Sequence, residues 1–369
     1  MKLVLDATSI SSGGGVQQCI SQLEAFDNQD KEVVFLCTQN FPLFLLPSLR
    51  FMEVRVLPFR NRFLIFIFQI WLSRYYKLIS DADVVYTFFG IGLRTRKNTK
   101  AIVNIAYPII CYYESAFWYY LGFRKRLLTY FKSYTRSFFI KLHSDTILCE
   151  SEVMRDRLID TLGVRAEMVH ILPPALNLVA SQGSSRSLPD RSLTDLKFLY
   201  PTGLDPHKNV VRLYDLFRRY SSFSKPFKVY ITCTRSEFLT YLRKLRPIDK
   251  SILDSYFVFC GKLFGDDLVD MYRRVNCVIN VSDLESVSNN FIESKSFELP
   301  MLISARDFSL SCVRTPFVIC EPHCTASLKD AFESFLAGYL LEPRCSDKLL
   351  AISPHDRVSR LLGLISSDK

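Results

Sequence analysis

The most constraining feature of this 369-residue chain is a pattern of short apolar segments that alternate with amphipathic ones. Residues 2–7, 32–37 and 146–149 have the length and composition of buried strands. Residues 16–26 and 124–142 instead repeat apolar side chains at helical spacing. Because strands alternate with helices, the pattern predicts a mainly parallel sheet that is covered on both faces.

This alternation is interrupted once, by a polar, Ser-rich stretch over residues 180–193, and then starts again. Strands are predicted in the second half at 197–200, 228–232, 256–260, 277–281, 301–304 and 317–320, with helices at 210–220, 266–275, 290–297 and 327–335. We therefore expect an α/β protein with two doubly wound domains that face each other across a cleft. The expected parts are a first domain (1–178), a linker (179–196), a second domain (197–352) and a C-terminal helix (353–369) that can cross back to the first domain.

The net charge of +10 is concentrated in one part of the chain. Residues 55–141 contain fifteen Lys or Arg and three acids, so this block carries +12 and the rest sums to −2. Such a block favours a polyanionic partner, and no nucleic-acid motif accompanies it. The most apolar run, residues 63–72, is too short to span a bilayer as a helix. Basic residues flank the run and Trp71 lies at its end, which favours a position at a membrane interface over a buried core segment.

Three groups of residues fall where predicted strands end, which is where open parallel sheets bind ligands. Gly14 and Gly15 follow the first strand, and consecutive glycines let a backbone approach a ligand closely. Lys208 follows the first strand of the second half and is placed to hold a phosphate. Glu285 and Glu293 follow the strand at 277–281, and both are expected at the mouth of the cleft.

The order and spacing of these segments resemble the retaining family 4 glycosyltransferases of GT-B fold. The resemblance is carried by residues 198–209 (FLYPTGLDPHKN), by 258–263 (VFCGKL), by the two glutamates eight residues apart, and by 297–304 (FELPMLIS). It is specific in the second half and looser in the first, where the glycine loop contributes.

The resemblance implies a role for each matching residue. Glu285 would face the donor sugar, and Lys208 would stabilise the charge on the leaving diphosphate. Glu293 would accept hydrogen bonds from the ribose hydroxyls. The further donor-binding residues implied are Gly14, Gly15, Gly203, His207, Gly261, Lys262, Leu263, Ser288, Asn289 and Asn290. No metal and no cofactor are implied, since the nucleotide-sugar is a substrate.

The sequence departs from the family pattern at three places. Leu204 stands where most members have Arg, and His207 is the candidate to replace that cation. The residues after Glu285 are Ser-Val-Ser in place of Gly-Phe-Gly, and Glu298 stands where the family has Gly. These departures bear on the identity of the donor.

An aromatic segment, residues 107–120, is either core or the lining of an acceptor groove, with Tyr107 and Glu114 as candidate acceptor-binding residues. The Asp81-Ala82-Asp83 sequence matches a metal motif of a different glycosyltransferase fold, but it precedes a strand instead of following one. The eleven cysteines contain no C-x-x-C pair, and no secretory signal is recognisable at Met1, so a reducing, cytoplasmic location is expected.

The expected function is retaining transfer of a sugar from a nucleotide-sugar to a saccharide acceptor in cell-surface polysaccharide synthesis. The acceptor is expected to be lipid-linked. The basic block and residues 63–72 would then hold the enzyme on the inner, anionic face of the membrane. The alternatives are a non-catalytic protein of the same fold that binds nucleotide-sugars or polyanions, and a nucleotide-sugar epimerase of related fold. The two glutamates together with the lysine loop argue against the epimerase.

Overall fold

A computed structural model describes residues 1–11, 14–29, 31–183, 195–344 and 350–367. The chain divides into two compact units. Unit 1 comprises Met1–Glu114, Leu121–Asn177 and Ala351–Lys369, and unit 2 comprises Ser115–Tyr120 and Leu178–Leu350. The main division at 177/178 lies next to the boundary expected at residue 178. The assignment of Ser115–Tyr120 to unit 2 was not expected.

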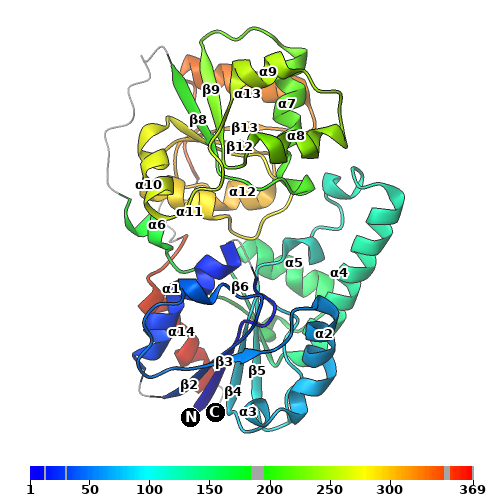
Figure 1. Ribbon diagram of the computed structural model, residues 1–369, viewed down its shortest axis with the longest axis vertical. Helices are drawn as coiled ribbons and strands as arrows, with labels where there is room; N and C mark the ends of the chain where they lie inside the picture. Colours follow the sequence, from blue (N-terminus) through cyan, green and yellow to red (C-terminus); the bar gives the residue numbers. More distant parts are fainter. Residues whose placement is uncertain (12–13, 30, 184–194, 345–349, 368–369) are drawn as a thin grey trace. The chain divides into compact units, whose positions relative to one another are not determined.

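In the described part of unit 1, seven parallel strands form a sheet in the order β3-β2-β1-β4-β5-β6-β7 (Figure 1). The strands are β1 (Lys2–Asp6), β2 (Glu32–Thr38), β3 (Glu53–Leu57), β4 (Val84–Phe88), β5 (Lys100–Ile105), β6 (Thr146–Cys149) and β7 (Val169–Ile171). Its helices are α1 (Gly14–Asp27), α2 (Arg62–Ile67), α3 (Lys77–Ser80), α4 (Phe123–His143), α5 (Glu152–Leu162) and α14 (Pro354–Ser367). Buried apolar strands thus lie between helical layers, as the alternating pattern predicts.

The C-terminal helix, α14, belongs to unit 1 and lies beside α1 (Figure 1). Val358, Leu361 and Ile365 enter the same core as Leu3 and Leu5 of β1. Arg357 is 1% exposed and fixes the helix by hydrogen bonds. It donates from Nε to Gln22 Oε1 (2.9 Å) and from Nη1 to the carbonyl oxygens of Leu172 (2.7 Å) and Pro173.

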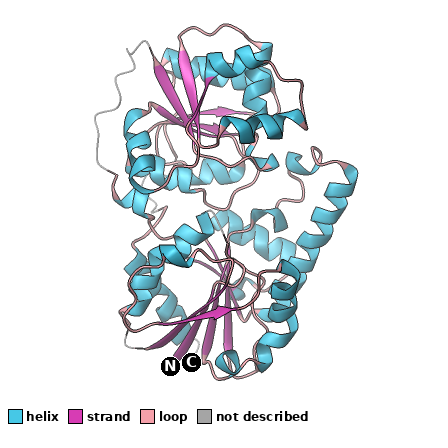
Figure 2. Ribbon diagram, viewed as in Figure 1, coloured by secondary structure: helices cyan, strands magenta, loops and turns pink. Residues whose placement is uncertain are grey.

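In the described part of unit 2, six parallel strands have the order β10-β9-β8-β11-β12-β13, with helices on both faces (Figure 2). The strands are β8 (Leu196–Tyr200), β9 (Phe227–Ile231), β10 (Phe257–Phe259), β11 (Cys277–Asn280), β12 (Met301–Ser304) and β13 (Phe317–Cys320). Its helices are α6 (Leu178–Ser181), α7 (Val210–Arg219), α8 (Arg235–Arg243), α9 (Lys250–Tyr256), α10 (Gly265–Arg274), α11 (Asn289–Ser296), α12 (Asp307–Cys312) and α13 (Thr325–Ala337).

The expected linker, residues 179–196, lies mostly outside the described residues. Its first residues belong to α6, and residue 196 begins β8. Residue 298, where the related family has Gly, adopts a φ of +52° at the end of α11. The backbone therefore keeps a left-handed conformation that glycine adopts most readily, although the residue is Glu.

Residues 63–72 form the helix α2 followed by a turn of π-helix over Phe68–Leu72. The run is amphipathic, because Ile65, Phe68 and Gln69 are buried while Phe63 and Trp71 are exposed. Across the described residues, no helix has both the length and the hydropathy that a bilayer span requires.

We expect the Arg357→Ala variant to lose about 3 kcal/mol of unfolding free energy, because Gln22 and the two carbonyl oxygens would be left buried without their donor. Urea denaturation measures the loss. Arg360→Ala is the matched control on the exposed side of the same helix, and its effect should stay within about 0.5 kcal/mol. Equal stability of the two variants would contradict the role of Arg357.

Candidate functional site

The centre of the sheet in unit 2 provides the position for a ligand site. From β8 the chain crosses to β9 on one side, whereas β11 lies on the other side of β8 and leads to β12. In open parallel sheets, ligands bind outside the carboxyl ends of the strands at such a switch point. Lys208 lies in the loop after β8, and Glu285 lies in the loop after β11. The topology therefore brings these two predicted residues to the same edge of the sheet.

Hydrogen bonds join the two loops to each other. The Asn209 side chain donates to the carbonyl oxygen of Val281 (2.9 Å), and the Asp283 amide donates to the carbonyl oxygen of His207 (2.8 Å). Asn209 has a φ of +59°, a left-handed conformation that turns the chain sharply from the short helix Pro206–Lys208 into α7. These contacts fix the direction in which the Lys208 side chain points from the backbone.

Lys208 Nζ forms a direct ion pair with Glu285 Oε1. Their side chains are 20% and 13% exposed, so the pair is shielded from solvent but can be reached. The hydroxyl of Tyr200 donates to the carbonyl oxygen of Lys208. Burial and the nearby charge of Glu285 hold the pKa of Tyr200 well above its usual value, so this donor stays protonated. The residues predicted as catalytic are thus in contact, with the lysine charge held against a carboxylate.

Glu293 lies one turn into α11 and its side chain is 3% exposed. Its Oε2 accepts a hydrogen bond from the hydroxyl of Tyr272, a buried residue of α10. Burial, together with the charge of Glu293, raises the pKa of Tyr272 well above its usual value. The carboxylate is therefore oriented by a phenol that sequence reasoning did not connect to it. The contact of Glu293 with a ribose stays a prediction.

The start of α11 contains the other predicted residues of this loop. Ser288 is the N-cap, and Asn289 and Asn290 are the first helical residues. Ser288 and Asn290 are buried. The first amides of a helix lack acceptors within the helix and favour anions, which suits the phosphate or sugar contacts expected there.

The remaining predicted donor-binding residues of unit 2 lie in the loops after β8 and β10. Gly203 follows β8, and Gly261 follows β10 with a φ of +70°, which favours glycine there. Lys262 is exposed and Leu263 is partly buried. β10 lies two strands away from β8 in the sheet order.

His207 does not supply the cation that Leu204 lacks. Burial, and then the charge of Lys208, lower the pKa of His207 below 6.5, so its ring is uncharged at neutral pH. The ring packs edge-on against Phe117, with 6.2 Å between the ring centroids. Leu204 packs against the apolar core of unit 2. His207 can still bind a donor through neutral hydrogen bonds.

The predicted residues of unit 1 lie in separate places within that unit. Gly14 and Gly15 begin α1, and a Cβ on Gly15 would make ordinary contacts, the nearest at 3.5 Å from Phe89 Cδ2. Tyr107 is 41% exposed and lies under the guanidinium of Arg136, 4.1 Å from the ring centroid. Glu114 is mostly exposed.

Glu114 forms an ion pair with Arg157, a residue of α5. Arg157 also lies over the ring of Tyr112, 4.0 Å from its centroid. The carboxylate proposed to touch an acceptor is thus held by a structural cation at the edge of the aromatic segment.

A network around Asp283 is the main feature that sequence reasoning missed. Asp283 is 1% exposed and accepts from Arg306 Nη2 (3.0 Å) and His323 Nε2 (2.8 Å). Arg306 also pairs with Glu321 at 2.7 Å. These residues follow β11, β12 and β13, which are neighbours in the sheet. The order of the strands in the sheet brings these residues together, and no motif in the sequence links them.

The segment Ser115–Tyr120 packs onto this network within unit 2. The ring of Tyr120 stacks on His323, with 4.1 Å between centroids and 8° between planes. The guanidinium of Arg212 lies over the ring of Tyr120, 4.2 Å from its centroid. The aromatic segment predicted as core or acceptor lining thus ends in a stacked contact beside Asp283.

Among the described residues, no group of three or more His, Cys, Asp or Glu side chains is arranged to hold a metal ion. In the Asp-x-Asp sequence, Asp83 accepts a hydrogen bond from the amide of Lys2 (2.7 Å) and lies 4.0 Å from the amino group of Met1. Asp83 therefore stabilises the start of β1.

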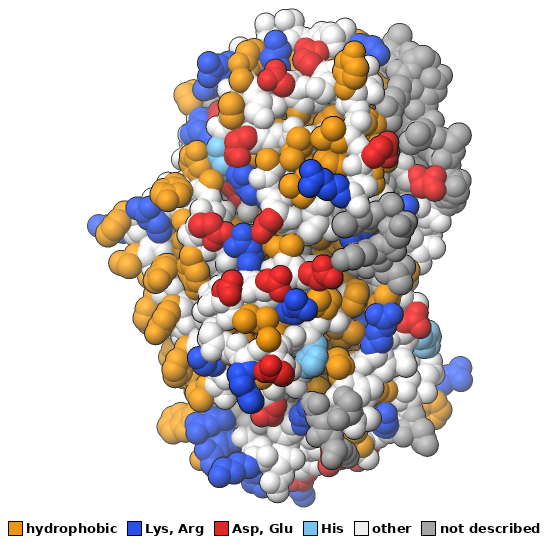
Figure 3. Space-filling view, turned by 180° about the vertical axis from the view of Figure 1, so that it is seen from behind, with side chains coloured by type: hydrophobic (Ala, Val, Ile, Leu, Met, Phe, Trp, Pro, Cys, Tyr) orange, Lys and Arg blue, Asp and Glu red, His pale blue; other side chains and the backbone are white. Residues whose placement is uncertain are grey.

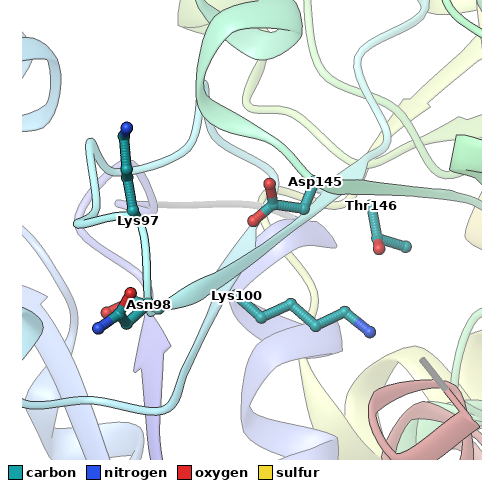
Figure 4. Close-up of a pocket in the computed structure, with 6 residues that line it drawn as sticks. Lys97, Asn98, Lys100, Asp145 and Thr146 are labelled. Carbon is teal, nitrogen blue, oxygen red and sulfur yellow. The ribbon is translucent and has the colours of Figure 1, made fainter. Parts of the chain in front are cut away.

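A cavity of about 340 Å³ in unit 1 is lined by Lys97, Asn98, Thr99, Lys100, Asp145 and Thr146 (Figure 4). Lys100 and Thr146 begin β5 and β6, so the cavity lies at the amino ends of strands. Lys100 donates to the carbonyl oxygen of Leu364 (3.2 Å), and Asp145 accepts from the amide of Ala101 (2.8 Å). These polar groups connect structural elements, and the cavity is at the end of the sheet opposite to that where ligands bind.

The hydrogen bonds and ion pairs of Asp283 should make the stability of the protein depend on pH. Burial raises the pKa of Asp283, but hydrogen bonds and charge from His323 and a hydrogen bond from Arg306 outweigh it, and the pKa is below 3.8. A carboxyl with a lowered pKa contributes stability above its unfolded pKa, and the contribution is lost as the pH falls through the folded pKa. The stability advantage of the wild type over Asp283→Asn should therefore be constant near neutral pH and shrink below about pH 4.

Urea denaturation across this pH range checks the prediction. Asp270→Asn is the control, because Asp270 forms exposed ion pairs with Arg273 and Arg274 that add little stability. An advantage over Asp283→Asn that grows on acidification would refute the account.

Residues 12–179 match the family model Glycosyltransferase Family 4. No curated protein matches the sequence significantly. Among solved structures, WaaG, described as a glycosyltransferase involved in lipopolysaccharide biosynthesis, is similar with a TM-score of 0.69 and 15% identity. The similarity covers 98% of this chain and 100% of WaaG.

Two further structures resemble the whole chain. HepE of Anabaena, solved in complex with UDP and glucose, has a TM-score of 0.65 and 11% identity, and 100% of each chain is covered. Sucrose-phosphate synthase from Thermosynechococcus elongatus has a TM-score of 0.68 and 14% identity, covering 100% of this chain and 98% of that one. At these identities the likeness concerns the fold, which is that of two Rossmann-like domains. Residues 12–179 therefore resemble the family 4 glycosyltransferases, and the chain has the GT-B fold.

Proposed function

We propose that the protein is a retaining glycosyltransferase that transfers a sugar from a nucleotide-sugar to a lipid-linked saccharide in cell-surface polysaccharide synthesis. The observation that carries the proposal is the Lys208–Glu285 pair at the switch point of the sheet in unit 2. HepE and WaaG support it, the first by its complex with UDP and glucose and the second by its described role in lipopolysaccharide biosynthesis.

In the proposed reaction, a hydroxyl of the acceptor attacks the anomeric carbon on the face from which the diphosphate leaves. The bond between this carbon and the phosphate oxygen breaks, the new glycosidic bond forms, and the hydroxyl proton passes to the departing phosphate oxygen. Lys208 stabilises the negative charge that builds on the diphosphate. Glu285 faces the sugar, and Glu293 binds the ribose. No metal enters this scheme.

The ion pair between Lys208 and Glu285 has a consequence for donor binding. Lys208 is held by Glu285 until a diphosphate competes for its charge. Release of the carboxylate then leaves Glu285 available to the hydroxyls of the sugar. Binding of the donor would thus replace the ion pair by two contacts with the donor. Lys208 would contact the diphosphate, and Glu285 would contact the sugar.

A second candidate function is binding of a nucleotide-sugar without catalysis. It is favoured by Leu204, which packs into the core where the family has a cation, and by the uncharged state of His207. Both functions require a nucleotide site in unit 2. Transfer to an acceptor, or slow hydrolysis of the donor in its absence, separates them in favour of the enzyme.

We expect one of UDP, GDP, dTDP or CMP, each at a few millimolar, to raise the melting temperature of the protein. A ligand at 100 times its dissociation constant adds about 2.7 kcal/mol, which corresponds to a shift of several degrees. Lys208→Ala should abolish most of the shift. Failure of every nucleotide to shift the transition would count against the donor site.

Substitutions at the site should separate binding from chemistry. Lys208→Ala and Glu293→Ala are each expected to lower transfer or nucleotide affinity at least tenfold, about 1.4 kcal/mol. Glu285→Gln keeps the shape of the side chain and should lower kcat more than nucleotide affinity. Lys295→Ala, on the exposed side of α11, is the matched control. If neither alanine variant at the site reaches a tenfold loss, the assignment is wrong.

A further inference from the structure

Helix α4 of unit 1 exposes an unusual amount of apolar surface. Of its 21 residues, all of them described, Ser133, Ile140 and His143 are buried. Large apolar side chains are between 51% and 73% exposed at Phe123, Leu127, Leu128, Tyr130, Phe131, Tyr134, Phe138 and Leu142. Single exposed apolar residues are ordinary, but a contiguous set of this size marks an interaction surface.

These side chains form a stripe along the helix. Phe123, Leu127, Phe131, Phe138 and Leu142 are separated by multiples of about one turn and fall within an arc of about 100°. Ser133 and Ile140 lie on the opposite side of α4, where Ser133 donates to the carbonyl oxygen of Ile109 (3.3 Å). The helix is therefore attached through the side that carries Ser133 and Ile140, and its apolar stripe faces outward.

The stripe continues onto the neighbouring segment of unit 1. Phe139 of α4 packs edge-on against Phe66 of α2, with 5.6 Å between centroids. Phe63 and Trp71, at either end of that segment, are 66% and 60% exposed. Figure 3 shows hydrophobic and basic side chains gathered along the edge of unit 1 where α4 lies. The surface thus contains both the predicted interfacial run and α4, whose basic residues belong to the block that the sequence predicts to face the membrane.

Charge decides which partner fits this surface. Helix α4 carries six basic residues and no acidic one; they are Arg124, Lys125, Arg126, Lys132, Arg136 and Lys141. A second copy of the same surface would bring two sets of positive charges together. An anionic lipid leaflet instead offers negative headgroups to the basic residues and an acyl boundary to the aromatic and leucine side chains.

We propose that α4 lies in the plane of an anionic membrane leaflet and inserts its Phe, Leu and Tyr stripe below the headgroups. This inference deepens the proposed function and rests on it, because a lipid-linked acceptor would be presented at the membrane. It also gives Tyr107 a place, because Arg136 of α4 lies over its ring. A candidate acceptor residue would then be next to the membrane surface that presents the acceptor.

The test is flotation of the full chain with phosphatidylcholine vesicles and with vesicles of phosphatidylcholine and phosphatidylglycerol in equal parts. The wild type should float with the anionic vesicles and at least tenfold less with the neutral ones. The triple variant Leu127→Ser, Phe131→Ser and Phe138→Ser should reduce flotation at least tenfold. Since these side chains are exposed, the variant should fold as the wild type does.

Two comparison variants make the outcome specific. Arg124→Gln, Lys125→Gln and Arg126→Gln together should weaken flotation and its salt dependence. The control, Phe264→Ser with Tyr339→Ser, changes exposed aromatic residues of unit 2, 66% and 76% exposed, and should float as the wild type does. The Phe131→Trp variant should show a larger blue shift of tryptophan emission with anionic vesicles than the wild type, whose Trp71 and Trp118 give the reference signal.

The proposal is overturned if the wild type does not float, if the triple serine variant floats unchanged, or if α4 instead mediates a dimer in solution. The thermal shift by nucleotides, measured without vesicles, reports on the proposed donor site independently. A variant that keeps this shift and loses flotation supports the role of α4, whereas a wild type that floats without any nucleotide shift leaves α4 supported and the donor site rejected.

Discussion

The site in unit 2 depends on the parallel pairing of β8 with β11 and on crossovers that leave these strands in opposite directions. This arrangement leaves the loops after both strands next to each other and uncovered by a crossing helix. The contacts of Asn209 with Val281 and of Asp283 with His207 then fix one loop against the other. The contact between Lys208 and Glu285 follows from this backbone geometry, because the fixed loops hold the two side chains within reach of each other.

Much of the fold could be predicted because buried parallel strands consist of continuous runs of apolar residues. β11 and β12 are fully buried and were predicted within about one residue. β3 was missed because it is an edge strand whose residues are mostly exposed, so its pattern carries little hydrophobic signal. The polar helices α8 and α9 were missed as well, and their ends depend on local caps such as the box of Thr234 and Glu237.

The candidate site was predictable to the level of loops, and not to the level of side-chain partners. Strand ends placed Lys208 and Glu285 at one edge, which spacing alone can indicate. The hydrogen bond between Tyr272 and Glu293 joins two helices, and the stack of Tyr120 on His323 joins segments about two hundred residues apart. Periodicity also showed the apolar stripe of α4, but it could not tell which side of a helix faces the core.

The return of α14 to unit 1 has a consequence for synthesis of the chain. Val358, Leu361 and Ile365 complete a core that begins with the first strand. While the ribosome is still producing unit 2, the face of unit 1 that α14 covers stays open, with Gln22 lacking its arginine partner. Unit 2 can close as soon as residue 350 emerges, whereas unit 1, begun first, finishes last. A nascent chain therefore exposes this apolar surface to chaperones until α14 has emerged.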